Sequence, residues 1–249
     1  MEHARRVAAL YDIHGNLPAL EAVLEEVARE DVDAIVVGGD VVPGPMPGRT
    51  VDMLLALTRP VHFICGNGER DVLAFLQGEV PSRVPPDFHS AMRWVADGLS
   101  RHHVEALAAW GATTRIAVAG LGEVLFCHAT PRNDNEIFTR RTPEDRLRPL
   151  MEATGARVVV CGHTHMQFDR TAGDVRVANA GSVGMPFGQP GAYWALLGPD
   201  VELRRTSYDL EAAAQRIRAT EYPDAAGFDP VRPPSADAML EAFEAAALR

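Results

Sequence analysis

Short hydrophobic runs that end in a glycine or a polar residue recur along this chain, and segments with helical spacing separate them. In the first half the runs are RRVAALY (5–11), DAIVVGG (33–39) and VHFIC (61–65). Their β-branched and aromatic residues predict strands, and the apolar spacing of 17–30 and 47–58 predicts helices between them. A helix supplies the long crossover that a parallel pair of strands needs. This alternation therefore restricts the first half of the chain to βαβ units.

The second half has a different pattern, in which hydrophobic runs follow one another closely. A tight turn joins two expected strands within 115–127, and later strands are expected at 157–161, 175–179, 192–197 and 201–207. The close spacing predicts that these later runs are neighbouring antiparallel strands. Further helices are expected at 69–77, 88–98, 101–110, 143–154, 209–220 and 236–248. We therefore expect an α/β fold in which two packed mixed β-sheets are flanked by helices.

Charge and hydropathy exclude several classes of protein. The formal net charge of the chain is -10, which disfavours stable binding to nucleic acid or to an anionic membrane. The apolar segment from Val7 to Leu10 is too short for a signal peptide, and no stretch approaches the ~18 apolar residues of a membrane span. We therefore expect a soluble, cytoplasmic protein. The sequence carries no signal for its oligomeric state.

Polar side chains follow the ends of five expected strands. Asp12 and His14 form an i, i+2 pair after the first run, and His163 and His165 form another after RVVVCG. In an extended backbone, such pairs point to the same side. The full set of candidates is Asp12, His14, Asp40, Asn67, His128, His163 and His165. Because ligands of open α/β sheets gather at the carboxyl ends of strands, we expect these side chains to converge.

The number of candidates limits the kind of site they can form. Seven oxygen and nitrogen ligands are too many for one tetrahedral zinc ion. They fit two cations that share one carboxylate, an arrangement that phosphoester chemistry uses. The residue types alone therefore favour a two-metal site.

Five motifs occur in a fixed order along the chain: D-x-H-G-N (12–16), G-D-V (39–41), G-N-x-E (66–69), the lone His128, and G-H-T-H (162–165). Together they resemble the calcineurin-like metallophosphoesterase superfamily. The segments 128–132 and 179–184 resemble its small prokaryotic phosphodiesterase-like branch. The resemblance covers about residues 5–207 and implies a four-layer αββα sandwich. It implies a metallophosphoesterase catalytic domain at 1–208, with a C-terminal helical tail at 209–249 packed on it or appended to it.

The resemblance also implies roles for the candidate residues. One metal would be held by Asp12, His14 and His165, the other by Asn67, His128 and His163, with Asp40 bridging both. Neutral imidazoles favour manganese, iron or zinc over magnesium. A hydroxide that bridges the two divalent ions would attack phosphorus, with Asp40 and Asn67 in the catalytic centre.

The implied activity is hydrolysis of a small phosphoester or nucleotide, with phosphodiesters or nucleotides favoured and phosphomonoesters possible. Alternative activities are those of a protein serine/threonine phosphatase or a dinucleoside polyphosphate hydrolase. A non-catalytic, metal-bound scaffold is a further alternative.

The chain departs from the family pattern at Gly68, where a histidine that assists the leaving group is common. His89 is one candidate for its replacement. Arg132 could act in catalysis and contact the substrate phosphate, or form a structural ion pair. Asn16 could bind the substrate phosphate or cap a helix.

Overall fold

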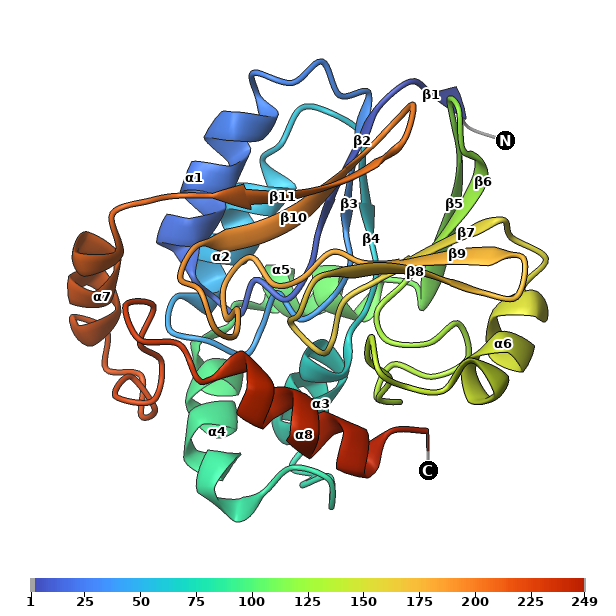
Figure 1. Ribbon diagram of the computed structural model, residues 1–249. Coiled ribbons are helices and arrows are strands. Elements are labelled where there is room, and N and C mark those ends of the chain that lie inside the picture. Colours follow the sequence, from blue (N-terminus) through green and yellow to red (C-terminus); the bar gives the residue numbers. More distant parts are fainter. Residues whose placement is uncertain (1–2, 249) are drawn as a thin grey trace.

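The computed structural model describes residues 3–248 and has two β-sheets that pack face to face (Figure 1). The strands of the five-stranded sheet lie in the order β11-β10-β2-β3-β4. Their bounds are β2 (Val7–Leu10), β3 (Ala34–Val37), β4 (Val61–Phe63), β10 (Ala192–Leu197) and β11 (Val201–Thr206). Because β2, β3 and β4 pair in parallel, the βαβ units predicted for the first half are confirmed.

The six-stranded sheet has the order β1-β5-β6-β7-β9-β8. Its strands are β1 (His3–Ala4), β5 (Thr113–Val118), β6 (Gly122–Cys127), β7 (Val158–Cys161), β8 (Phe168–Ala172) and β9 (Val175–Asn179). β5 and β6 form the predicted hairpin, whereas β6, β7 and β9 are parallel. The three parallel strands all end on the side of the sheet from which the loops of the candidate site emerge.

The predicted antiparallel arrangement of the four later strands is wrong in part. β7 pairs in parallel with β9, and β10 and β11 belong to the other sheet, where β10 pairs antiparallel with β2. The cause is β8, which was not predicted because FDRTA is mostly polar. This edge strand carries the chain back, so that β9 enters the sheet in the same direction as β7.

Helices cover the outer faces of both sheets and complete four layers (Figure 1). On β2, Ala8 and Leu10 face the helices, while Val7 and Ala9 face the other sheet, as the period of two requires. The helices are α1 (Leu17–Val27), α2 (Pro47–Leu55), α3 (Asn67–Leu76), the 3-10 helix η1 (Pro86–Phe88), α4 (His89–Gly98), α5 (Arg101–Ala108), α6 (Glu144–Glu152), α7 (Leu210–Arg218) and α8 (Ala236–Ala246). The predicted α/β fold with two packed mixed sheets is therefore confirmed.

The C-terminal tail packs closely on the main body. Arg216 of α7 forms a two-pronged ion pair with Glu21 of α1. Tyr222 and Phe228, in the connector between α7 and α8, are buried in the same core as α1 and the five-stranded sheet. The tail therefore shares its core with the residues before 209.

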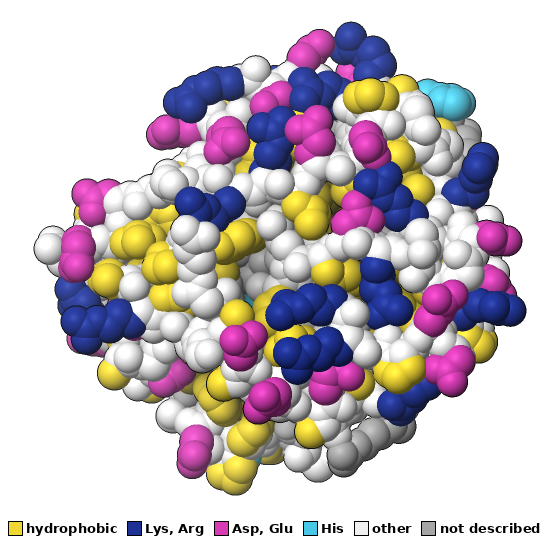
Figure 2. All heavy atoms as spheres, in the orientation of Figure 1, with side chains coloured by type: hydrophobic (Ala, Val, Ile, Leu, Met, Phe, Trp, Pro, Cys, Tyr) yellow, Lys and Arg dark blue, Asp and Glu magenta, His cyan; other side chains and the backbone are white. Residues whose placement is uncertain are grey.

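The surface carries both signs of charge. On the face in Figure 2, Lys/Arg and Asp/Glu side chains are interspersed across the molecule. Of the helices within residues 3–248, none combines the length and the apolar character that crossing a membrane demands.

Candidate metal centre

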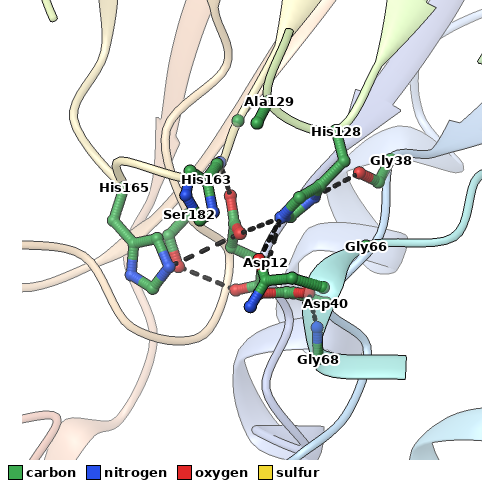
Figure 3. Close-up of polar contacts among 12 residues, drawn as sticks. Asp12, Gly38, Asp40, Gly66, Gly68, His128, Ala129, His163, His165 and Ser182 are labelled. Atoms are coloured by element: carbon green, nitrogen blue, oxygen red, sulfur yellow. Dashed lines mark hydrogen bonds and ion pairs between the residues drawn. The ribbon is translucent and has the colours of Figure 1, made fainter. Parts of the chain in front are cut away.

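All seven candidate side chains come together where strands of both sheets end. Figure 3 shows five of them: Asp12, Asp40, His128, His163 and His165. Asp12 follows β2, Asp40 follows β3, and Asn67 begins α3 just after β4. From the other sheet, His128 follows β6, and His163 and His165 follow β7. The centre therefore lies across the junction of the two sheets.

Six of these side chains form two groups, in each of which one ligand atom per residue lies within 4.8 Å of the others. One group is Asp12, His14 and His165; the other is Asp40, His128 and His163. His163 and His165 thus lie in different groups, although one residue separates them in the sequence.

Asn67 extends one group, and Asp40 connects the two. Asn67 Oδ1 lies 3.2 Å from His128 Nε2, which adds an amide oxygen to the second group. Asp40 Oδ2 lies 3.5 Å from His128 Nε2 and 3.7 Å from His14 Nε2. This single oxygen atom is therefore placed between a histidine of each group.

Backbone carbonyls orient three of the four imidazoles. Nδ1 of His14 lies 3.1 Å from the Pro43 carbonyl, that of His128 lies 2.9 Å from Gly38, and that of His165 lies 2.7 Å from Met185. Because a carbonyl oxygen only accepts, each Nδ1 carries the hydrogen and donates it. The Nε2 lone pairs are left pointing into the centre, as is usual for metal-binding histidines.

The directions of these lone pairs indicate whether the site is suited to bind cations. His14 Nε2 and His165 Nε2 are 3.2 Å apart, so two acceptor atoms face each other. Asp12 Oδ1 is buried and makes no hydrogen bond within residues 3–248, and its polar neighbours are His165 Nε2 at 3.4 Å and His128 Nε2 at 3.9 Å. Facing acceptors and an unsatisfied buried carboxylate oxygen are unfavourable unless a cation lies among them. The donor set therefore fits divalent metal ions.

Electrostatics favour ionised carboxylates at the centre. Burial opposes the charge on Asp40 and Asp12, but the neighbouring histidines outweigh it and hold the pKa of each carboxyl below its usual range. Burial would also lower the pKa of His128, but Asp40 and Asp12 raise it to about 10. Burial and His128 together lower the pKa of His163 to about 4. The buried negative charge is thus strong enough to attract protons or cations.

The backbone at the centre is unusual. Asp12, His14, Asp40, His163 and His165 have φ between 47° and 67°, the left-handed region. The strands end before these residues, so the extended i, i+2 geometry expected for His163 and His165 is wrong. Because each left-handed residue turns the chain sharply, the two rings reach different groups.

The atoms around Gly68 leave no room for a side chain at this position. A Cβ on Gly68 would lie 2.2 Å from the Val42 carbonyl oxygen and 2.8 Å from Asp40 Oδ1. The Gly68 N–H donates to Asp40 Oδ1 at 2.7 Å. The loop after β3 therefore fills the space that a histidine would need.

His89 does not take over this position. Its Nε2 lies 2.9 Å from the Val84 carbonyl, and its ring packs against Phe75 near the last turn of α3. Gly68 lies in the first turn of the same helix.

Glu69 is a structural residue of the centre that sequence reasoning did not single out. Its fully buried carboxylate accepts four backbone N–H groups, from Gly66 and from Asp40, Val41 and Val42, at 2.7–3.1 Å. Burial and the Asp40 charge raise its pKa to about 7. Its place in the G-N-x-E motif was the available signal. Glu69 ties the loop that carries Asp40 to the loop that carries Asn67.

The structure separates the two alternatives for Asn16. Its Oδ1 accepts from Ala19 N at 3.2 Å, and its Nδ2 donates to the Gly184 carbonyl and to the Tyr208 hydroxyl. The side chain is fully buried, so it caps α1 and keeps no free donor for a substrate phosphate. The expectation that Asn16 binds substrate is therefore wrong.

Arg132 has features of both of its predicted roles. Its guanidinium forms a two-pronged ion pair with Glu136, at 2.6–3.0 Å. The side chain is exposed and lines a cavity of about 340 Å³ that also includes His128 and Arg70. The ion pair fixes Arg132 at the edge of this cavity.

Comparisons with known proteins agree with this geometry. Residues 6–200 match the family model for the calcineurin-like phosphoesterase superfamily domain. A comparison with curated proteins finds no match. The fold is similar to that of a hypothetical protein from Pyrococcus horikoshii OT3, with 20% identity over 94% of this chain and 100% of that one and a TM-score of 0.78.

A metallophosphoesterase from Sphaerobacter thermophilus is also similar, with 23% identity over 98% of this chain and 99% of that one and a TM-score of 0.69. At these identities the two structures show the fold. The family model spans most of the chain, including every strand-end motif identified above. The chain therefore belongs to the calcineurin-like phosphoesterase superfamily.

Proposed function

We propose that this protein hydrolyses phosphoesters with two divalent cations, manganese, iron or zinc. Asp12, His14 and His165 would hold one cation, and Asn67, His128 and His163 the other. The observation that carries the proposal is the position of Asp40 Oδ2, 3.5 Å from His128 Nε2 and 3.7 Å from His14 Nε2. A carboxylate between two groups of ligands is suited to join two cations.

The residues of the chain prepare the centre for this reaction. Divalent cations, when bound, polarise the phosphoryl group and make water a stronger acid. The carbonyl partners keep Nε2 of His14, His128 and His165 aimed at the centre. The Gly68 N–H donates to Asp40 Oδ1, so Oδ2 stays available. A water oxygen bonds to phosphorus as the ester P–O bond breaks. The attacking water loses a proton, and the departing oxygen keeps the electron pair of the broken bond and takes up a proton, so that a phosphodiester gives a phosphomonoester and an alcohol.

The residues near the expected position of the leaving group favour phosphodiesters or nucleotides as substrates. Gly68 has no side chain to donate a proton, so departure depends on the acidity of the leaving alcohol. The cavity beside His128 is lined by Arg70 and Arg132, each held by a carboxylate, Asp134 and Glu136 respectively. Guanidinium groups suit anionic oxygens, which supports a substrate with phosphate oxygens beyond the reacting ester.

Metal analysis with Asp40→Asn tests the proposal. We expect two metal ions per wild-type chain and loss of both, or of most activity towards bis-p-nitrophenyl phosphate, in Asp40→Asn. Asp97→Asn is the matched control, because Asp97 is exposed on α4. One tightly bound zinc ion in an active wild-type protein would contradict the two-metal centre.

A series of substrates tests the leaving-group argument. We expect activated aryl diesters to be cleaved far faster than alkyl monoesters. Rates independent of the leaving-group pKa, with chemistry as the slow step, would mean that another residue donates the proton.

A further inference from the structure

The C-terminal helix reaches the metal centre from outside the segment that matches the family. The match ends at residue 200, whereas α8 begins at Ala236. Phe243 of α8 lies against Phe187, with ring centroids 6.0 Å apart. Phe187 is stacked on the ring of His165, with centroids 5.2 Å apart and an interplanar angle of 13°. Two aromatic rings thus connect α8 to a candidate metal ligand.

His165 depends on one loop for its orientation. Its Nδ1 donates to the carbonyl of Met185, and its ring face lies on Phe187. Both contacts come from the loop between β9 and β10. If this loop moves, the hydrogen bond and the stacking contact change together.

The residues just before the N-terminus of α8 attach to the loop between β9 and β10. Just before the helix, the Pro234 carbonyl accepts a hydrogen bond from Gly188 N at 2.8 Å. Gly188 directly follows Phe187, so this bond and the Phe243 contact hold the same short stretch of chain.

The other end of α8 attaches to the loop that follows His128 and to helix α6. Glu244 accepts hydrogen bonds from the hydroxyls of Thr139 and Thr142. Arg146 donates to the carbonyls of Ala247 and Leu248 at 2.9 and 2.8 Å. Figure 1 shows α8 running between these two regions of the molecule. The helix therefore joins the loop that contacts His165 to the loop that follows His128.

We propose that α8 is a brace of the metal centre, in which Phe243 holds Phe187 against His165. Phe187 and Phe243 are then positioning residues for the group of Asp12, His14 and His165. The inference rests on the proposed function, because the orientation of His165 matters only if it binds a metal. Residues that contact a metal-binding side chain and fix its orientation typically contribute about 10–100-fold to metal affinity.

Titration of the full-length, metal-free protein with Mn²⁺ tests the brace without measuring turnover. We expect two sites in the wild type, and in Phe243→Ala a loss of about tenfold or more in affinity at one site only. Glu241→Ala, at an exposed position of the same helix, should match the wild type. Unchanged affinity in Phe243→Ala, or equal weakening of both sites, would overturn the brace.

A double-mutant cycle separates positioning from general stability. Phe187→Ala should weaken the same site, and Phe187→Ala/Phe243→Ala should be no weaker than Phe187→Ala alone, because Phe243 acts through Phe187. Fully additive losses would overturn the brace. If Phe243→Ala does not fold, Phe243→Leu replaces it, and wild-type affinity in both Phe243→Leu and Phe187→Ala overturns the proposal.

The titration also distinguishes the two proposals. A wild-type protein that binds two Mn²⁺ but hydrolyses no phosphoester overturns the proposed function alone. Fewer than two Mn²⁺ per wild-type chain overturns the metal centre and the brace together.

Discussion

At the residue scale, the centre consists of side chains on strained backbone. Five non-glycine residues have left-handed φ angles there, and such conformations cost of order 1–3 kcal/mol each. They are Asp12, His14, Asp40, His163 and His165. The strain persists because hydrogen bonds such as that from His163 N to Asp12 Oδ2, at 2.8 Å, fix the loops around them. The same loops leave little room for substitution.

Gly68→Ala should displace the Asp40 loop. The new Cβ would lie 2.2 Å from the Val42 carbonyl oxygen, so this backbone must move. We expect a loss of about 1–3 kcal/mol in unfolding free energy together with lower metal content. Gly98→Ala is the control, because no atom lies within 4 Å of a Cβ there. A Gly68→Ala protein with wild-type metal content and stability would show that the loop yields at no cost.

Glu69→Gln should loosen the connection between the Asp40 and Asn67 loops. The amide nitrogen would face backbone N–H groups that now donate to a carboxylate oxygen. We expect a loss of about 2–4 kcal/mol, measured by denaturant unfolding, because buried donors lose a charged acceptor. The exposed Glu79 gives the control, Glu79→Gln. Equal unfolding curves for the two variants would argue against the connecting role.

At the element scale, loops carry the chemistry and the sheets fix where the loops begin. Gln167, just before β8, is a contact between the two sheets. Its Nε2 lies 3.0 Å from the carbonyl oxygens of Ala180, Trp194 and Arg204. Ala180 follows β9 in one sheet, and the other two residues lie in β10 and β11 of the other sheet.

Gln167→Leu should therefore weaken the junction of the sheets. The carbonyl oxygens would lose their shared donor, at an expected cost of about 1–3 kcal/mol in urea unfolding. Gln215→Leu, at an exposed position of α7, should have little effect. An unchanged unfolding midpoint in Gln167→Leu would mean that water replaces the amide.

At the scale of the whole molecule, the candidate metal centre brings together residues from both sheets. Asp12, Asp40 and Asn67 follow strands of the five-stranded sheet, whereas His128, His163 and His165 follow strands of the other. Ligands from two sheets converge only in the folded chain. Metal binding should therefore stabilise the fold as a whole.

Metal removal should lower the unfolding free energy of the entire chain. A ligand at 100 times its dissociation constant stabilises the state that binds it by about 2.7 kcal/mol. We expect the melting temperature of the wild type to rise with Mn²⁺ concentration and that of Asp40→Asn to rise much less. An identical melting temperature with Mn²⁺ and with EDTA would contradict the coupling of metal binding to folding.

Local sequence patterns were sufficient to predict much of the architecture. Alternating strand and helix patterns predicted β2, β3 and β4 and their parallel pairing. The residue types at strand ends, with the family motifs, predicted the seven side chains that come together. Such features depend on residues that are close together in the sequence, so they can be recognised from the sequence directly.

The pairing of the later strands and the surroundings of the site residues depend on contacts between segments that are distant in the sequence. The polar edge strand β8 reverses the chain direction, so that β9 pairs in parallel with β7. The next strand, β10, pairs with β2 in the other sheet. Likewise, Glu69 acquired its role from loops 27–29 residues away, and Gly68 from the Val42 carbonyl that fills the space around it. Hydrogen bonds and steric exclusion between distant segments arise only when the chain has folded. The residue types could therefore identify the candidate ligands but not the contacts that hold them.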